Sequence, residues 1–159
     1  MNRFFNAFSR SAALCAVAVL LAACTVLACG CSCVVEEFDP AVAYDRLLTE
    51  VKYDAPLQDM SEMAEYTFYD LPEGATVKMY AAADGAHEDA AIALIGAKEE
   101  DARQLESVLR DYIESRLYET DRYNPEESPK LRNAVMRTSG NIVILCITND
   151  TEAAHKILG

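Results

Sequence analysis

Tryptophan is absent from the 159 residues, glycine occurs only six times and histidine only twice. The lack of tryptophan argues against a site that stacks on sugar rings. With so few glycines, the chain has neither the Gly-x-x-x-x-Gly-Lys loop that holds phosphates nor a dinucleotide-binding fingerprint. No Gly-x-Ser-x-Gly segment occurs, and Ser139 lies in a predicted turn with no histidine nearby in sequence. These absences remove the commonest signatures of enzymes.

Charged side chains are missing from residues 11–35, which follow two arginines and precede all 26 acidic residues. A basic start followed by a short apolar core is typical of a secretory signal. The core ends at Leu21 to Cys24 (Leu-Ala-Ala-Cys), which resembles the lipobox of bacterial lipoproteins, where small residues admit the peptidase and the thiol accepts the lipid. We predict a lipoprotein signal peptide at 1–23, lipidation of Cys24 and a flexible tether at 24–40.

Two alternatives to this interpretation of the leader stay open. Cys29, which follows Val-Leu-Ala, also fits a lipobox, and the glycine and serine after it suit a tether. The 25 uncharged residues also exceed the roughly 20 that span a bilayer, so the leader is also consistent with an uncleaved helix. Because the arginines precede the segment and the acids follow it, both alternatives place the domain on the extracytoplasmic face of a cell membrane.

The charge balance and the cysteines restrict the partners and the chemistry. Without the leader the chain has 12 basic residues against 26 acidic ones, which repels phosphate backbones and argues against nucleic acid as a partner. Five of the six cysteines lie within 11–35, so a disulfide framework is not expected in the domain. The remaining thiol, Cys146, lies in an apolar stretch and is predicted to be buried.

Hydrophobic periodicity predicts an alternation of helices and hairpins. Helices are expected at 41–51, 60–66, 99–118 and 152–158, and strands at 76–83, 90–97, 133–138 and 142–148. Asp39-Pro40 suits a helix start, and Gly140-Asn141 suits a tight hairpin turn. The predicted architecture is a single α+β domain at 41–159, with a four-stranded, mainly antiparallel sheet in ββα-ββα order and helices on one face.

The order of these segments also suggests a family. A lipobox, Ala41-x-x-Tyr44-Asp45, an alternating strand, an Ala-Ile-x-Leu-Ile strand ending at Ala97-Lys98, a long charged helix and a terminal hairpin and helix follow one another. Together they resemble the bacterial lipoproteins of the family called domain of unknown function 4358, over residues 41–158. The resemblance implies a lipoprotein with a compact α+β domain and an unknown ligand, and it supplies no catalytic residues.

One polar loop offers candidate metal ligands. His87 lies beside Asp84, Glu88 and Asp89, and imidazole with carboxylates suits zinc or manganese. Short polar hairpin loops also look like this without any ligand, and the loop then has no role beyond connecting two strands. The second histidine, His155, is predicted to be an exposed residue of the last helix.

Two functions of different classes are consistent with these features. The first is a non-catalytic binding or interaction module, attached to the membrane through its N-terminal lipid, without a cofactor, that binds an unidentified protein or small molecule. Its contact surface would be the helix-free face of the sheet or the 119–132 loop, whereas Tyr112, Tyr118 and Tyr123 are predicted to pack at the edge of the core. The alternative is a metal-dependent extracytoplasmic hydrolase that uses the loop at 84–89.

Overall fold

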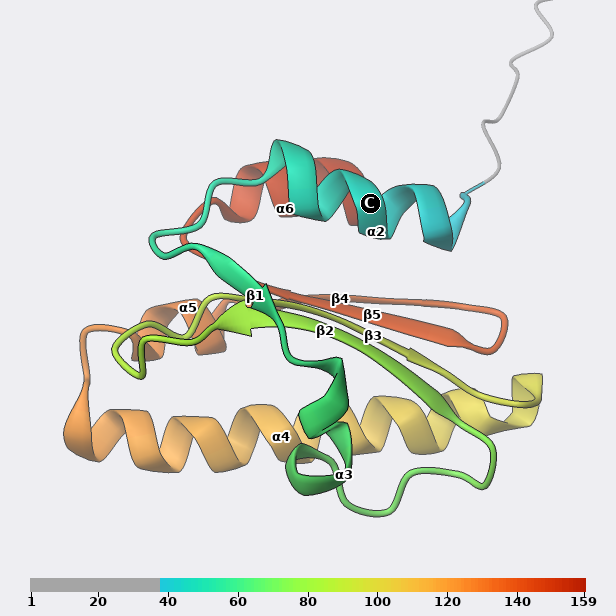
Figure 1. Cartoon of the computed structure of the whole chain (residues 1–159). Helices are drawn as coiled ribbons and strands as arrows, with labels where there is room; N and C mark the ends of the chain where they lie inside the picture. The colour runs from blue at the N-terminus through green and yellow to red at the C-terminus, as the bar shows by residue number, and fades with distance from the viewer. Residues whose placement is uncertain (1–37) are drawn as a thin grey trace, which may run out of the picture. The chain divides into compact units, whose positions relative to one another are not determined.

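A computed structural model describes residues 38–159, and the predicted leader, the candidate lipidation residues Cys24 and Cys29 and almost all of the tether lie outside the described residues. The described chain is a sheet with helices packed on it (Figure 1). In chain order the elements are α2 (Pro40–Glu50), β1 (Leu57–Asp59), η1 (Ser61–Met63), α3 (Ala64–Thr67), β2 (Thr76–Ala82), β3 (Ala90–Ile95), η2 (Glu99–Asp101), α4 (Ala102–Tyr123), α5 (Ser128–Arg132), β4 (Val135–Ser139), β5 (Ile142–Ile147) and α6 (Thr151–Leu158).

Five antiparallel strands form one sheet in the order β1-β2-β3-β5-β4. The α+β class and the antiparallel sheet are therefore confirmed, but the predicted number of four strands is wrong. The additional strand is β1, which pairs Leu57 with Ala82 at the edge of the sheet. With only three residues, β1 is too short to show the two-residue alternation by which strands are predicted.

Helices cover both faces of the sheet, so the prediction that they lie on one face is wrong (Figure 1). α3 and α4 pack on the face that carries Ile92 and Leu94. α2 and α6 pack on the opposite face, which carries Ala91 and Ala93. Because β3 is apolar at every position, each of its faces needs a cover that excludes water. The helix-free face predicted as a contact surface does not exist in this part of the chain.

The two helices of that second face begin close to their predicted positions. The side chain of Asp39 accepts a hydrogen bond from the backbone N–H of Ala41 at 2.9 Å, and Pro40 opens α2. The hydroxyl of Tyr44 donates to the carbonyl oxygen of Ala91 at 3.0 Å, which fixes α2 over β3. Asp150 caps α6. The short helix, the four longer strands and the Gly140-Asn141 turn are also confirmed.

The longest helix, α4, extends further than predicted. Its apolar stripe packs on the sheet as the spacing indicated, but the helix continues past Tyr118 and ends at Tyr123. α5 follows after four residues, so the region 119–132, which was predicted to be a loop, is largely helical. None of the helices within residues 38–159 is long and apolar enough to cross a membrane.

Candidate functional site

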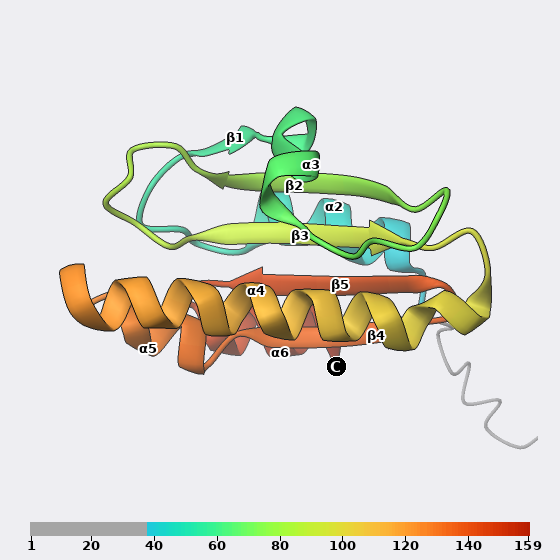
Figure 2. The same cartoon turned by 90° about the horizontal axis from the view of Figure 1, so that it is seen from below.

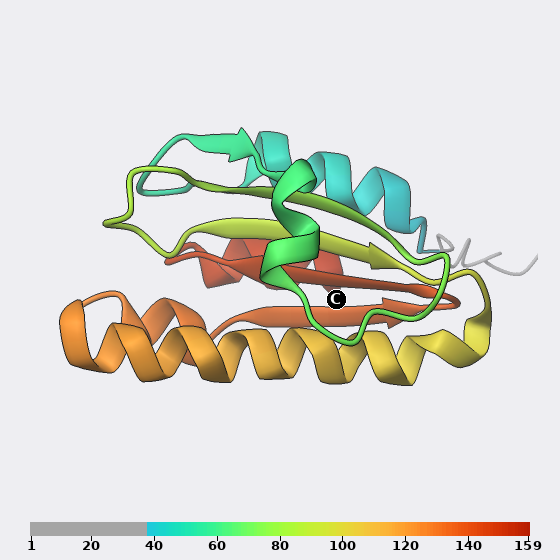
Figure 3. The ribbon, with the colours of Figure 1, turned by 60° about the horizontal axis from the view of Figure 1, so that its bottom comes forward.

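A groove is lined by residues of α3 and α4, and Ala81 of β2 and Ala90 of β3 lie at its floor. Figures 2 and 3 show the ribbons of α3 and α4 on the same face of the sheet, with α3 lying across β2 and β3. The volume of the groove is about 390 Å³. The floor is low because Ala81 and Ala90, which face each other in the β2–β3 ladder, have short side chains. The other lining residues are Met60, Tyr66, Thr67, Tyr69, Met79, Ala82, His87, Glu88, Asp89, Tyr112, Ser115, Arg116 and Glu119. We call this feature the α3–α4 groove.

The wall formed by α3 is fixed to α4 by direct contacts. The rings of Phe68 and Tyr112 lie with their centroids 5.3 Å apart. The Nε2 group of Gln104 donates to the carbonyl oxygen of Asp70 at 2.7 Å. Asp70 has a φ of 60°, a left-handed conformation that aspartate tolerates better than most residues. The groove is therefore formed by the fold itself, before any ligand binds.

Tyrosine side chains give the groove an aromatic rim. Tyr66 and Tyr69 are 73% and 76% exposed, although each is a large side chain with apolar ring faces. Tyr112 is half-buried, and burial raises the pKa of its hydroxyl to about 12. The Tyr112 hydroxyl therefore stays protonated at neutral pH. The predicted packing role at the edge of the core fits Tyr112, whereas Tyr118 and Tyr123 are 71% and 79% exposed.

One end of the groove holds an ion pair with an unequal charge balance. Arg116 of α4 contacts both oxygens of Glu88, at 2.6 Å through Nη2 and 2.9 Å through Nε, and it contacts Glu119 at 3.0 Å. Thr120 donates a further hydrogen bond to Glu88 at 3.1 Å. The hydrogen bond to Glu88 raises the pKa of Arg116, against the opposite effect of burial. Two carboxylates thus share one guanidinium, and a negative charge is left over at the groove.

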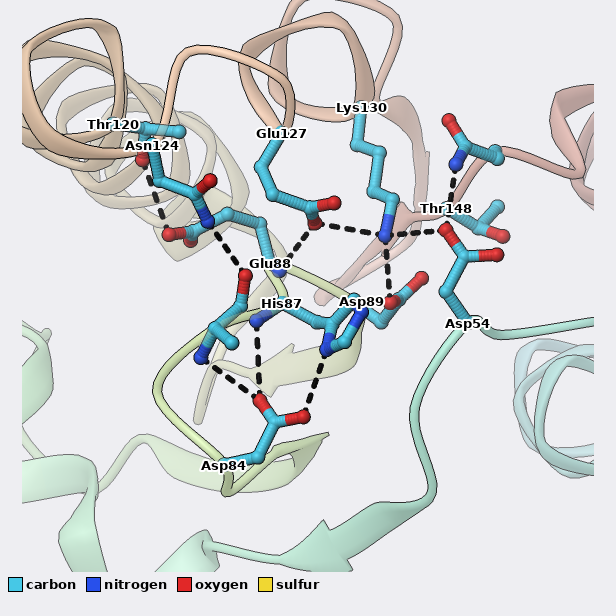
Figure 4. A network of polar contacts seen from close by, with 12 residues as sticks. Asp54, Asp84, His87, Glu88, Asp89, Thr120, Asn124, Glu127, Lys130 and Thr148 are labelled. Carbon is cyan, nitrogen blue, oxygen red and sulfur yellow. Dashed lines mark hydrogen bonds and ion pairs between the residues drawn. The ribbon is translucent and has the colours of Figure 1, made fainter.

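Close to Glu88 in sequence, Asp89 contacts a buried ammonium group, that of Lys130 (Figure 4). The Nζ atom of Lys130 in α5 is 2.7 Å from Asp54, 2.8 Å from Asp89 and 2.8 Å from Glu127, and the Lys130 side chain is fully buried. Burial alone would lower the pKa of Lys130, but the three carboxylate hydrogen bonds outweigh it and the pKa is raised. We call these four residues the Lys130 cluster.

The Lys130 cluster connects parts of the chain that are distant in sequence. Asp54 follows α2, Asp89 precedes β3, and Glu127 and Lys130 lie at α5. Glu127 also accepts a hydrogen bond from the backbone N–H of Glu88 at 2.9 Å, so the cluster supports the ion pair at the end of the groove (Figure 4). The Lys130 cluster therefore holds the residues at this end of the groove in position.

The four candidate metal ligands do not converge on one point. Asp84 and His87 contact each other, with Oδ2 and Nδ1 2.7 Å apart, at an exposed turn. Glu88 contacts Arg116. Asp89 contacts Lys130, on the other side of the segment (Figure 4). Consecutive residues of an extended segment point to opposite sides, which separates Glu88 from Asp89. Within residues 38–159 no group of three or more His, Cys, Asp or Glu side chains is placed to hold a metal ion.

The remaining candidates for chemistry are held in inert surroundings. The ring of His87 makes its hydrogen bond to Asp84 alone, and no hydroxyl or thiol of the described residues is bonded to it. Cys146 is buried and free, as predicted, and burial raises the pKa of its thiol to about 11. His155 is exposed on α6, as predicted. None of these groups is an activated nucleophile.

Sequence reasoning did not find the residues that matter most here. Lys130 lies in a short segment with no periodicity, and nothing in its neighbours indicates burial. Nothing in the sequence distinguishes Arg116 from the other charged residues of the long helix. Tyr66 and Tyr69 are separated by Phe68, which is buried, and only the fold reveals that the tyrosines border a groove.

Comparison with protein-family models, with curated proteins and with solved structures finds no match for this chain. The resemblance to the domain of unknown function 4358 therefore stays a prediction.

Proposed function

We propose that this chain is a lipoprotein held at the outer face of a cell membrane, in the manner of the family it resembles. In this proposal Cys24, or alternatively Cys29, carries the lipid, and residues 41–159 form a non-catalytic binding module. The proposal for the anchor is supported by the uncharged leader and its Leu-Ala-Ala-Cys end. Two or three acyl chains on one residue hold a protein firmly at a membrane, whereas a single chain holds it marginally.

The α3–α4 groove is the proposed contact surface of the module. The observation that carries this is a preformed groove bordered by two exposed tyrosines, Tyr66 and Tyr69. Tyrosine is enriched in binding surfaces because it offers a large rigid contact area and a polar tip. Binding is favoured over metal-dependent hydrolysis because Glu88 and Asp89 are already paired with Arg116 and Lys130.

The anchor is tested by mass spectrometry of the mature N-terminus from a bacterial host. We expect a diacylglyceryl-modified Cys24 as the first residue. Cys24→Ala should abolish the modification, and Cys29→Ala should leave it unchanged. A mature chain that begins at Cys29 would select the alternative lipobox, and a chain that retains Met1 would overturn the lipoprotein proposal.

The contact surface is tested with a photo-crosslinking amino acid at position 69 of the full-length protein, in cell membranes that contain it. Position 123 is the matched control, because Tyr123 is exposed to a similar extent, 79% against 76%, and does not line the groove. We expect a discrete crosslinked product from position 69 and none from position 123. Equal products from both positions, or none from either, would contradict the groove as the contact surface.

A further inference from the structure

The chain segment that contributes the α3 wall of the groove carries acidic charge only. Between Tyr53 and Val77 the sequence has six acidic residues and no lysine, arginine or histidine. The six are Asp54, Asp59, Glu62, Glu65, Asp70 and Glu73. Asp54 is one of the three carboxylates that share Lys130, and the other five lie along β1, η1, α3 and the turn that follows, outside the residues that line the groove. Such a wall repels anionic lipid and nucleic acid and attracts cationic groups.

The opposite wall does not cancel this charge. Arg116 is the basic residue of α4 that lines the groove, and it is already held by Glu88 and Glu119. The Glu119 side chain is 57% exposed, so its carboxylate faces solvent and has room for another cation. The groove therefore presents a carboxylate at its rim and no uncommitted arginine or lysine among its lining residues.

The groove also has the surfaces that hold the rest of a peptide. Met60, Met79 and Ala81 form an apolar floor, and the rings of Tyr66 and Tyr69 stand at the rim. A tyrosine face attracts an arginine or lysine side chain, while an apolar floor attracts an apolar one. A small polyamine would use the charge but not the floor. A peptide with both kinds of side chain uses both.

Building on the proposed function, we propose that the α3–α4 groove binds a short basic segment of a partner protein. An arginine or lysine of that segment lies against Tyr66 or Tyr69 and pairs with Glu119, and a neighbouring apolar side chain rests on the floor near Met79. The volume of about 390 Å³ is that of a small-ligand site, which fits a few residues of extended chain rather than a folded surface.

The test uses the full chain in detergent micelles and a fluorescein-labelled hexapeptide of alternating arginine and leucine. Fluorescence anisotropy should detect saturable binding that weakens with added salt. Two further hexapeptides separate the contributions: one has glutamate in place of arginine, and the other has serine in place of leucine. We expect no binding of the first and weaker binding of the second.

Variants distinguish the groove from general attraction to an acidic protein. Tyr66→Ala with Tyr69→Ala removes the cation–π contact whichever of the two rings makes it, and should weaken binding up to about fivefold. Addition of Glu119→Gln to the two tyrosine changes should weaken binding of the peptide further. The controls Tyr123→Ala and Glu114→Gln remove an exposed tyrosine and an exposed charge elsewhere, and they should leave binding within about twofold of the wild type.

Equal losses in the groove variants and in the controls would overturn the basic-peptide proposal, as would binding of the glutamate peptide or equal binding of the serine peptide. If crosslinking from position 69 succeeds while these peptides fail, the binding module stands and the ligand class is wrong. If both experiments fail, the groove is not the binding site.

Discussion

The two hairpins of the sheet are closed in different ways. β4 and β5 are joined by Gly140 and Asn141 alone, and Gly140 has the positive φ, 55°, that a tight turn requires at its first central residue. β2 and β3 are joined by residues 83–89, which are held by side chains of the distant α4 and α5. The backbone carbonyl of Ala86, for example, accepts a hydrogen bond from Asn124 at 2.6 Å.

This difference separates local from long-range determination of structure. The residues of the β4–β5 turn specify its shape, so the sequence alone predicts this turn. The polar residues of the β2–β3 connection acquire their roles only when Arg116, Asn124 and Lys130 approach in the folded chain. A loop that has the composition of a metal site is thereby converted into part of an internal salt-bridge network.

The largest effect on stability is expected from removal of the Lys130 ammonium group, which holds the connection between β2 and β3. Lys130→Met leaves Asp89 buried without a counter-charge, and breaking a buried ion pair from one side costs about 3–5 kcal/mol. The free energy of unfolding, measured by urea denaturation, should fall by that amount. Arg132→Met, two residues away in α5, breaks an exposed pair with Asp121 and should cost at most about 1 kcal/mol.

Addition of Asp89→Asn to Lys130→Met should recover part of the loss, because it removes the orphaned charge. A similar small cost for Lys130→Met and Arg132→Met would show that the Lys130 cluster does not stabilise the fold.

The next effect in size concerns the pair at the end of the groove. Glu88→Gln keeps the shape of the side chain but replaces charge-assisted hydrogen bonds to Arg116, which should cost about 2 kcal/mol in the same urea assay. Glu114→Gln, an exposed change on the same helix as Arg116, is the control and should be neutral within about 0.5 kcal/mol. Equal costs in the two variants would count against a stabilising role for this ion pair.

Glycines at the two connections provide a comparison of purely local cost. Gly85 and Gly140 have φ values of 69° and 55°, and an added methyl group would meet no close neighbour at either position. Gly85→Ala and Gly140→Ala should therefore each cost about 1–2 kcal/mol for the left-handed backbone. Calorimetric melting should give similar values for the two. A much larger cost at one position would show that its turn has constraints beyond its own backbone.

The smallest effect is a pH dependence of stability at the tip of the β2–β3 hairpin. Backbone and His87 hydrogen bonds lower the pKa of Asp84 to about 2, and the contact with Asp84 raises the pKa of His87. The stabilisation from His87 is therefore complete below its unfolded pKa of about 6.5 and is lost as the pH rises through the higher folded value. The stabilisation from Asp84 is lost only as the pH falls toward about 2.

Nuclear magnetic resonance should give a His87 titration midpoint above about 6.5. The melting temperature of the wild type should fall relative to His87→Gln as the pH rises through this midpoint. Parallel melting profiles for the two proteins, or a midpoint at or below the ordinary histidine value, would disprove the effect.

The sequence predicted the parts of the fold that depend on local pattern. Asp39-Pro40, the apolar run at 90–97 and the Gly140-Asn141 turn each specify an element through neighbouring residues. The placement of α4 and α6 on opposite faces depends on packing between layers, although the continuous apolar character of β3 contained a signal for two-sided burial. β1 was missed because its three residues owe their extended shape to pairing with β2.

The candidate site was less predictable than the fold. The loop at 84–89 was correctly identified as rich in potential ligands, but its partners lie 28 to 41 residues further along the chain. Tyr66 and Tyr69 become significant only because α3 packs beside α4. Sites that combine several elements depend on the tertiary arrangement, and the local composition of one loop does not reveal them.

The enclosure of Lys130 makes it a natural reporter of opening of the domain. The other four lysines, Lys52, Lys78, Lys98 and Lys156, are exposed and react freely with reagents that acylate primary amines. The Lys130 amine is shielded by its three carboxylates and by its burial, so it can react only in molecules in which α5 has separated from Asp54 and Asp89. The delay between acylation of the surface lysines and acylation of Lys130 thus measures how rarely the native chain opens.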